Sequence, residues 1–231
     1  MRIKHITYNR IYDVTNARKG KLTIGLTPGR GLKLFTSVYP KLHKDFPNLE
    51  VCPIEMRVKA QQDAISNGLL DIGFMTLEKK SRTNDEYIIL GQEELMLMLP
   101  SSHPIAIKYN TEDGSIPTIN IKELEGEPFV LMDKSSTLRA ICDIIFEKES
   151  FTPNILFETN NTAGISAMVE STLCCGIIPW FYARNTSNKL KCFHLEGKPS
   201  WDIAISYSKN NYLSSGAKEF IELAKEWWND L

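Results

Sequence analysis

The stretch LTIGLTPGRGLKLFTSVYPKLHKDFP, residues 22–47, decides the fold class. It begins with a short apolar run at 22–26, which predicts a strand, and a turn rich in glycine follows. Apolar side chains then recur at helical spacing as far as Pro47, namely Leu32, Phe35, Val38, Tyr39, Leu42 and Phe46. A second apolar run at 49–54 predicts another strand, so the stretch indicates two parallel strands joined by a helix.

The same alternation continues along the chain. We expect a helix over about 57–67, ended by Gly68, then a strand at 71–75 and two more strands at 87–91 and 94–100. This order of strands and helices predicts a parallel sheet covered by helices, which is an α/β fold.

A second α/β block follows the polar segment between Ser101 and Glu127, where we place a domain boundary. Strands are expected at 128–132, 154–158, 174–178, 191–195 and 201–207, with helices near Leu138 and Ile165 and at the C-terminal end. If the last strand and helix return to the first block, the chain crosses between the blocks twice, near 100 and near 200. Two crossings make a hinge and leave a cleft, where α/β folds bind ligands.

Composition restricts the class of protein. The 231 residues are 42% hydrophobic and 24% charged with a net charge of −1, which fits a soluble globular protein and argues against nucleic-acid binding by the whole chain. The sequence has no apolar run of about 20 residues and no signal-peptide pattern, so we expect a cytoplasmic protein without a membrane partner. Its five cysteines show no CxxC spacing, and we interpret Cys174 and Cys175 as small buried side chains rather than a redox pair.

The glycine-rich turn resembles a nucleotide loop only in part. A dinucleotide fingerprint needs a small residue where Leu34 stands, although Glu50 and Glu55 lie where a ribose-binding acid is expected. A phosphate loop needs Gly-Lys-Ser or Gly-Lys-Thr, which the chain lacks. The turn instead offers Thr27 and the first amides of the following helix, which favour an anion.

Two other helix starts share this chemistry, at Ser135-Ser136-Thr137 and at Asn160-Asn161-Thr162. All three follow strands, and together they favour a small anionic or polar ligand, although each also fits an ordinary helix N-cap. Arg30 is suited to a ligand carboxylate or to the surface, whereas Trp180 and Phe181 either wall the cleft or pack in the core.

Signals for an enzyme are weak. The chain has no GxSxG or HExxH motif and no cluster of histidine and cysteine, and its four histidines are scattered. We therefore expect no catalytic residue, no cofactor and no metal site.

Several segments together resemble the effector-binding domain of LysR-type transcriptional regulators, and the resemblance covers about 20–231. They are GKLTIG (20–25), YPKLHKDFPNLEV (39–51), AISNGLLDIGFM (64–75), ELMLMLPSSHPIA (94–106), AMVESTLCCGIIPW (167–180) and AKEFIELAKEW (217–227).

The resemblance implies two Rossmann-like subdomains of the type 2 periplasmic-binding-protein fold, with a double crossover and an interdomain cleft. Subdomain I would comprise 20–100 and 201–231, and subdomain II 101–200. The resemblance also implies a small effector in the cleft, held by Thr27, Pro28, Gly29, Arg30 and Gly31, by Ser135, Ser136 and Thr137, and by Pro179, Trp180 and Phe181. To these, the helix start at 160–162 adds Asn160 as a candidate.

The resemblance also implies partners. Residues 1–19 would be the end of a linker helix, which explains why residues 1–21 carry five more basic than acidic side chains. The N-terminal winged helix-turn-helix of the family is absent from this sequence, and we expect the sequence to be an excised fragment of a longer protein. That protein would bind DNA only through its N-terminal domain. We expect a homodimer or higher homo-oligomer in which helix 32–46 meets the partner's second subdomain. The alternatives are a solute-binding protein of a transport system and an enzyme built on the same fold.

Overall fold

The computed structural model describes residues 19–109, 111, 114–171, 174–184 and 187–231. The helix expected over 1–19 lies outside this range except for Lys19, which begins strand β1. The chain divides into two compact units: unit 1 ends at Gln92 and resumes at Asp202, and unit 2 is Glu93–Trp201. The chain therefore passes between the units twice, within β4 (Glu86–Pro100) and within β10 (Ser200–Tyr207).

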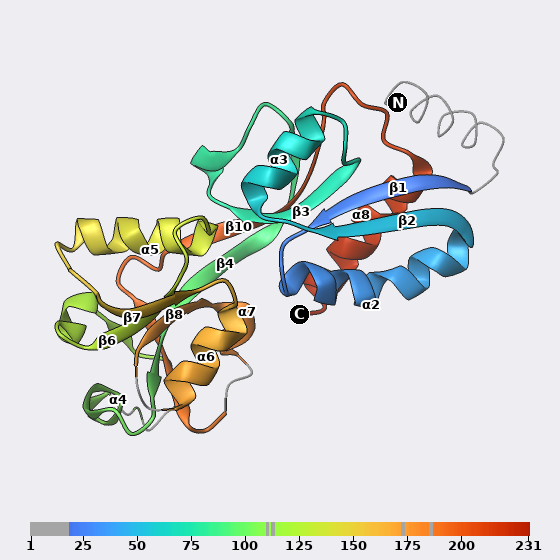
Figure 1. Ribbon diagram of the computed structural model, residues 1–231. Coiled ribbons are helices and arrows are strands. Elements are labelled where there is room, and N and C mark those ends of the chain that lie inside the picture. The colour runs from blue at the N-terminus through green and yellow to red at the C-terminus, as the bar shows by residue number, and fades with distance from the viewer. Residues whose placement is uncertain (1–18, 110, 112–113, 172–173, 185–186) are drawn as a thin grey trace. The chain divides into compact units, whose positions relative to one another are not determined.

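Unit 1 is built around strand β1, which has a parallel neighbour on each side. Its elements are β1 (Lys19–Leu26), α2 (Arg30–Asp45), β2 (Asn48–Glu55), α3 (Val58–Ser66), β3 (Ile72–Leu77), the short 3-10 helix Lys79–Ser81, and α8 (Ser215–Asn229). The strand order is β2-β1-β3-β10, with β10 antiparallel to β3. Helix α2 packs against α8 on one face of the sheet, and α3 covers the other face (Figure 1).

Unit 2 contains two small sheets. Its elements are the second half of β4, α4 (Pro104–Lys108), β5 (Thr118–Ile119), the 3-10 helix Ile121–Leu124, β6 (Pro128–Met132), α5 (Thr137–Lys148), β7 (Asn154–Thr159), α6 (Thr162–Glu170), β8 (Gly176–Pro179), α7 (Trp180–Ala183) and β9 (Leu190–Leu195). Strand β4 pairs antiparallel with both β8 and β9, and β5 runs parallel to β9. Strands β6 and β7 form a separate parallel pair.

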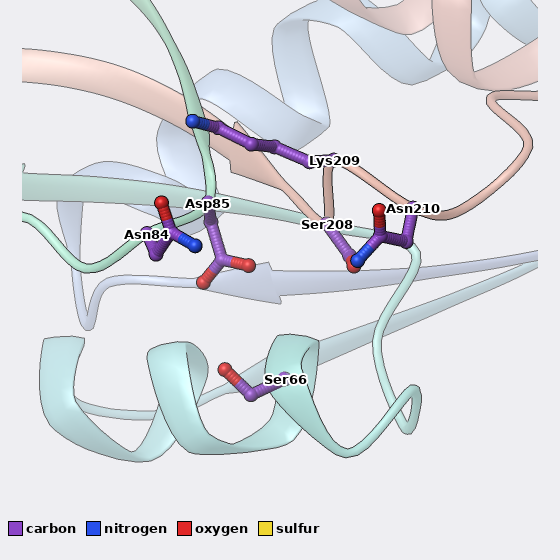
Figure 2. A pocket seen from close by; sticks show the side chains of 6 residues that line it. All are labelled: Ser66, Asn84, Asp85, Ser208, Lys209 and Asn210. Atoms are coloured by element: carbon purple, nitrogen blue, oxygen red, sulfur yellow. The ribbon is translucent and has the colours of Figure 1, made fainter.

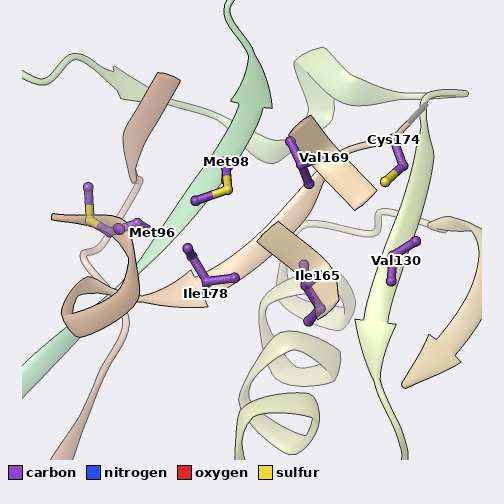
Figure 3. Close-up of a cluster of buried hydrophobic side chains, with 8 residues drawn as sticks. Met96, Met98, Val130, Ile165, Val169, Cys174 and Ile178 are labelled. Atoms are coloured by element: carbon purple, nitrogen blue, oxygen red, sulfur yellow. The ribbon is translucent and has the colours of Figure 1, made fainter. Parts of the chain in front are cut away.

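One cluster of buried hydrophobic side chains in unit 2 lies between these strands and α6 (Figure 3). It consists of Met96 and Met98 from β4, Val130 from β6, Ile165 and Val169 from α6, and Cys174, Ile178 and Ala183, all at most 4% exposed. Gly176 is part of this contact, because a Cβ built there would lie 2.4 Å from Ile165 Cγ2. A side chain at Gly176 would thus separate β8 from α6.

Two sequence predictions about the strands are wrong in detail. The two strands expected at 87–91 and 94–100 form one strand, β4, which is unbroken at Gly91. Gly91 is present because of a close approach and not because of a turn: a Cβ there would lie 2.2 Å from Trp228 Nε1. The strand expected at 174–178 begins only at Gly176, although Cys175 still makes a parallel bridge to Phe129.

Helices α4 and α7 were not expected from the sequence. Each has only four or five residues, which is too short for an apolar period to show.

We predict that Gly176→Ala lowers the free energy of unfolding by about 1–3 kcal/mol, because it overpacks the contact between β8 and α6. Gly164→Ala is the matched control on α6, since its Cβ would meet its nearest neighbour at 3.7 Å, an ordinary contact. That control should raise the free energy of unfolding by about 0.5–1 kcal/mol, as alanine does in a helix. Urea unfolding measures both, and equal effects of the two substitutions would contradict the packing described.

Three of the five cysteines are buried in unit 2. Cys142, Cys174 and Cys175 are at most 3% exposed, as the interpretation of the vicinal pair expected. Burial raises the pKa of Cys174 to about 11 and the pKa values of Cys142 and Cys175 to about 12. A thiol with such a pKa holds almost no thiolate at neutral pH and is a poor nucleophile.

We therefore predict that Ellman's reagent at pH 8 modifies only Cys52 and Cys192 rapidly, since these two are partly exposed. The other three thiols should react after unfolding in guanidinium chloride. A third thiol that reacts rapidly in the native protein would show that one of the buried cysteines is accessible and activated.

Candidate functional site

The loop Thr27–Gly31 joins the carboxyl end of β1 to α2. Thr27 N–H donates to Phe74 O of β3 at 3.2 Å, which fixes the loop to the neighbouring strand. Gly29 has φ 74°, a left-handed conformation that suits glycine and turns the chain into α2. Pro28 and Gly29 are exposed, whereas Thr27 and Gly31 are buried.

Thr27 carries the most informative polar atom of this loop. The residue is only 7% exposed, and its Oγ1 has no hydrogen-bond partner within the part of the chain that the structure describes. A buried hydroxyl without a partner costs free energy, so such a group calls for a partner from outside the chain. Beside it, Arg30 begins α2 and is 3% exposed, so a cationic side chain is buried at the same helix start.

Several backbone amides of the loop already donate within the chain. Gly29 N–H donates to Glu55 Oε1 at 3.2 Å, and Gly31 N–H donates to Thr27 O at 2.9 Å. Lys33 N–H, one of the amides that the sequence suggested was free, donates to Gly29 O at 3.1 Å. These amides therefore do not serve an external anion, and the side chain of Thr27 carries the case for a ligand.

The predicted helix starts of unit 2 are capped by their own side chains. Ser135 donates its hydroxyl to Asp133 Oδ1 at 2.7 Å, and Ser136 Oγ accepts the Arg139 amide at 3.0 Å. At the start of α6, Asn161 Oδ1 accepts the Ala163 amide at 3.0 Å. The alternative of an ordinary N-cap is thus the one observed for Ser136 and Asn161. Thr137 is half-buried and Asn160 is exposed.

The third segment, Pro179–Phe181, begins helix α7. Trp180 is 39% exposed, whereas Phe181 is 8% exposed. Phe181 N–H donates to Glu93 Oε1 at 2.7 Å, and the indole Nε1–H of Trp201 donates to Glu93 Oε2 at 2.7 Å. Glu93 is only 5% exposed, so this is a buried carboxylate with both oxygens bonded.

Sequence reasoning missed Glu93. A signal was present, because Glu93 shares one face of β4 with Leu95 and Leu97, both fully buried. A glutamate on the same strand face as core residues is expected to be buried, and a buried carboxylate needs hydrogen-bond partners inside the protein.

The structure brings the predicted segments of unit 2 to one edge. Strands β6 and β7 are parallel, and Asp133 N–H donates to Thr159 O at 2.8 Å just beyond them. The parallel bridge between Phe129 and Cys175 gives the segment that leads into β8 the same direction. The residues that follow β6, β7 and β8 therefore lie at the carboxyl ends of their strands, on the same side of unit 2.

A polar hollow of about 370 Å³ lies elsewhere in unit 1 (Figure 2). It is lined by Ser66, Asn84, Asp85, Ser208, Lys209 and Asn210, none of which was a predicted site residue. Residues 208–210 follow β10, which is antiparallel to β3, so the hollow lies toward the amino end of β3. Thr27 follows the carboxyl end of β1, which runs parallel to β3, and is thus at the opposite edge of the sheet.

In the described ranges, His, Cys, Asp and Glu side chains form no group of three or more that could hold a metal ion. Of the helices that the structure describes, none is long and apolar enough to cross a membrane.

Curated relatives of the chain are transcriptional regulators. An uncharacterized HTH-type regulator of Bacillus subtilis, YwbI, is 29% identical over 219 residues, covering 93% of this chain and 69% of its own length. The Hca operon transcriptional activator HcaR of Escherichia coli is 25% identical, covering 89% of this chain and 67% of its own length. The chain spans about two thirds of the length of the curated relatives it matches, 66% for several of them.

Solved structures show the same fold. The effector-binding domain of QuiR in complex with shikimate superposes with a TM-score of 0.71 at 16% identity, covering 92% of this chain and 98% of that one. The regulatory domain of CcmR from Synechocystis PCC6803 in complex with 2-PG gives a TM-score of 0.76 at 14% identity, covering 91% and 98%. The reduced form of OxyR gives a TM-score of 0.70 at 22% identity, covering 90% of this chain and 96% of that one. The expected type 2 periplasmic-binding-protein fold is confirmed.

The sequence profile of the LysR substrate binding domain matches residues 15–229, which is nearly the whole chain. The resemblance seen in the sequence motifs is therefore confirmed, and the chain belongs to the LysR substrate-binding domain family.

Proposed function

We propose that the chain is the ligand-sensing regulatory domain of a bacterial LysR-type transcription factor, and that its two units are the regulatory subdomains. It would bind a small polar or anionic effector and would not act as an enzyme. The observation that carries this proposal is the buried hydroxyl of Thr27 at the carboxyl end of β1, which has no hydrogen-bond partner among the described residues, in a chain of this family. The effector-bound domains of QuiR and CcmR, which share the fold, support it.

The effector site would comprise Thr27–Gly31, Ser135–Thr137, Asn160 and Pro179–Phe181. The chemistry of these segments favours a ligand with a hydrogen-bond acceptor for Thr27, and Arg30 supplies a buried positive charge for an acidic group. Glu55 and Glu93 accept amides in two of these segments, so a ligand with several negative charges is disfavoured.

The proposed response is a change in the hinge. The chain crosses between the units in β4 and β10, and an effector that contacts both units would favour one arrangement of them. Such a ligand shifts the equilibrium only by its difference in affinity for the two arrangements. In a cytoplasmic homodimer or larger homo-oligomer, that change would reach a DNA-binding domain outside this chain. The relatives are regulators, which favours this role over a transport protein.

The ligand should first be sought by thermal shift with shikimate, 2-PG, benzoate, inorganic phosphate and single amino acids, because a ligand that binds the native state raises the melting temperature. We predict that Thr27→Val weakens binding of the stabilising compound three- to tenfold, about 1 kcal/mol, by isothermal titration calorimetry.

Thr27→Val should leave the melting temperature of the free protein unchanged or raised, since the hydroxyl has no partner in the described part of the chain. Thr36→Val on the exposed face of α2 is the control, because the Thr36 hydroxyl donates to Lys33 O of its own helix. Unchanged affinity in Thr27→Val, or a loss equal to that of the control, would contradict the proposed site.

A further inference from the structure

Glu93 connects three segments that are far apart in the sequence. It lies on β4, and its two carboxylate oxygens accept the Phe181 amide of α7 and the Trp201 indole of β10, each at 2.7 Å. All three residues are at most 8% exposed. A buried carboxylate is held firmly when both oxygens are bonded, because loss of either donor leaves charge unpaired away from water.

Two of these residues stand where the chain changes units. Glu93 is the first residue of unit 2, and Trp201 is the last. Leu95 N–H donates to Pro199 O at 2.8 Å, so β4 is also joined by its backbone to the residue that precedes β10. The Glu93–Trp201 bond thus ties the strand that enters unit 2 to the strand that leaves it.

A second pair stands on the other side of each crossing. Gln92, the last residue before unit 2, donates from Nε2 to Asp202 Oδ1 at 3.2 Å, and Arg82 forms an ion pair with Asp202. Successive side chains of a strand point to opposite faces, so the Gln92–Asp202 and Glu93–Trp201 pairs lie on opposite faces of these strands. Both crossings are therefore fixed by side chains as well as by the backbone.

We propose that Glu93 is a positioning residue that couples the first turn of α7 to the two crossing strands. The inference rests on the proposed function, in which Pro179–Phe181 contributes to the effector site. Because the Phe181 N–H is bonded to Glu93, an effector that moves this turn would displace the Glu93 carboxylate with it. Glu93 then shifts against Trp201, and the change reaches both crossings through three adjoining groups rather than through the whole core.

Hydrogen exchange measured by NMR tests this coupling without any ligand. Glu93→Gln keeps the shape but can accept only one of the two donors, since its amide nitrogen replaces one oxygen. We expect the Phe181 amide to exchange at least tenfold faster and the Leu95 amide to accelerate with it. The Trp201 indole N–H resonance should shift in the same variant.

Trp201→Phe keeps an aromatic ring and removes only the indole donor. We expect it to accelerate exchange at Phe181 at least threefold, although Phe181 itself is untouched, because Glu93 loses one of the hydrogen bonds that orient it. Glu94→Gln is the matched control on the adjacent residue, whose carboxylate pairs with His194 at 2.7 Å. It should leave the Phe181 amide within twofold of the unchanged protein.

Uniform acceleration of all core amides in Glu93→Gln, or an unchanged Phe181 amide in Trp201→Phe, would overturn the inference, because Glu93 would then contribute only to general stability. If Glu93→Gln does not fold, Trp201→Phe alone decides. If exchange at Phe181 and Leu95 accelerates as expected but the chain binds none of the screened compounds, the coupling through Glu93 is supported and the proposed function is contradicted. If a compound binds but exchange at Phe181 is unchanged in the variants, the proposed function is supported and the coupling through Glu93 is contradicted.

Discussion

The parallel pairing of β1 on both sides is the constraint on which unit 1 depends. Because β2 and β3 each run parallel to a neighbouring strand, the chain must return through a helix each time, which α2 and α3 provide. The carboxyl ends of these strands consequently lie at one edge, with Thr27 directly after β1. The position of the candidate site thus follows from strand direction, before any side chain is considered.

Side chains then decide which of the polar groups at these edges remain for a ligand. Glu55, Asp133 and Glu93 accept from the backbone of Gly29, Ser135 and Phe181, so a carboxylate accepts a backbone amide in each of three segments that were expected to contact the effector. The helix starts are mostly satisfied from within, as buried polar groups generally are. The Thr27 hydroxyl differs from these groups, because it has no hydrogen-bond partner in the part of the chain that the structure describes. Glu93 contributes to hydrogen bonding inside unit 2 rather than to a binding surface.

The sequence predicted those elements that show a local periodicity of apolar residues. The helical spacing of Val38 and Leu42 marked α2, and both are buried, whereas Leu32 of the same predicted set is 45% exposed and the buried Leu34 was not part of that set. What it missed depends on contacts between distant residues: Gly91 suggested a break in β4 until the position of Trp228 explained it, and nothing near Glu93 in the sequence announces Phe181 or Trp201. The cap at Ser136 is a local contact with the Arg139 amide, and the sequence had offered an ordinary N-cap there as the alternative to a ligand contact.

The proposed effector site consists of residues that follow β1 and β8, and it excludes the polar hollow. Backbone ¹H–¹⁵N correlation spectra of the chain, titrated with the compound that most stabilises it among those screened, test this most directly. The account predicts that the amides of Thr27 and Phe181 shift together along one saturation curve. Shifts confined to Ser66, Asn84, Asp85 and residues 208–210 would place the ligand in the hollow and contradict the account.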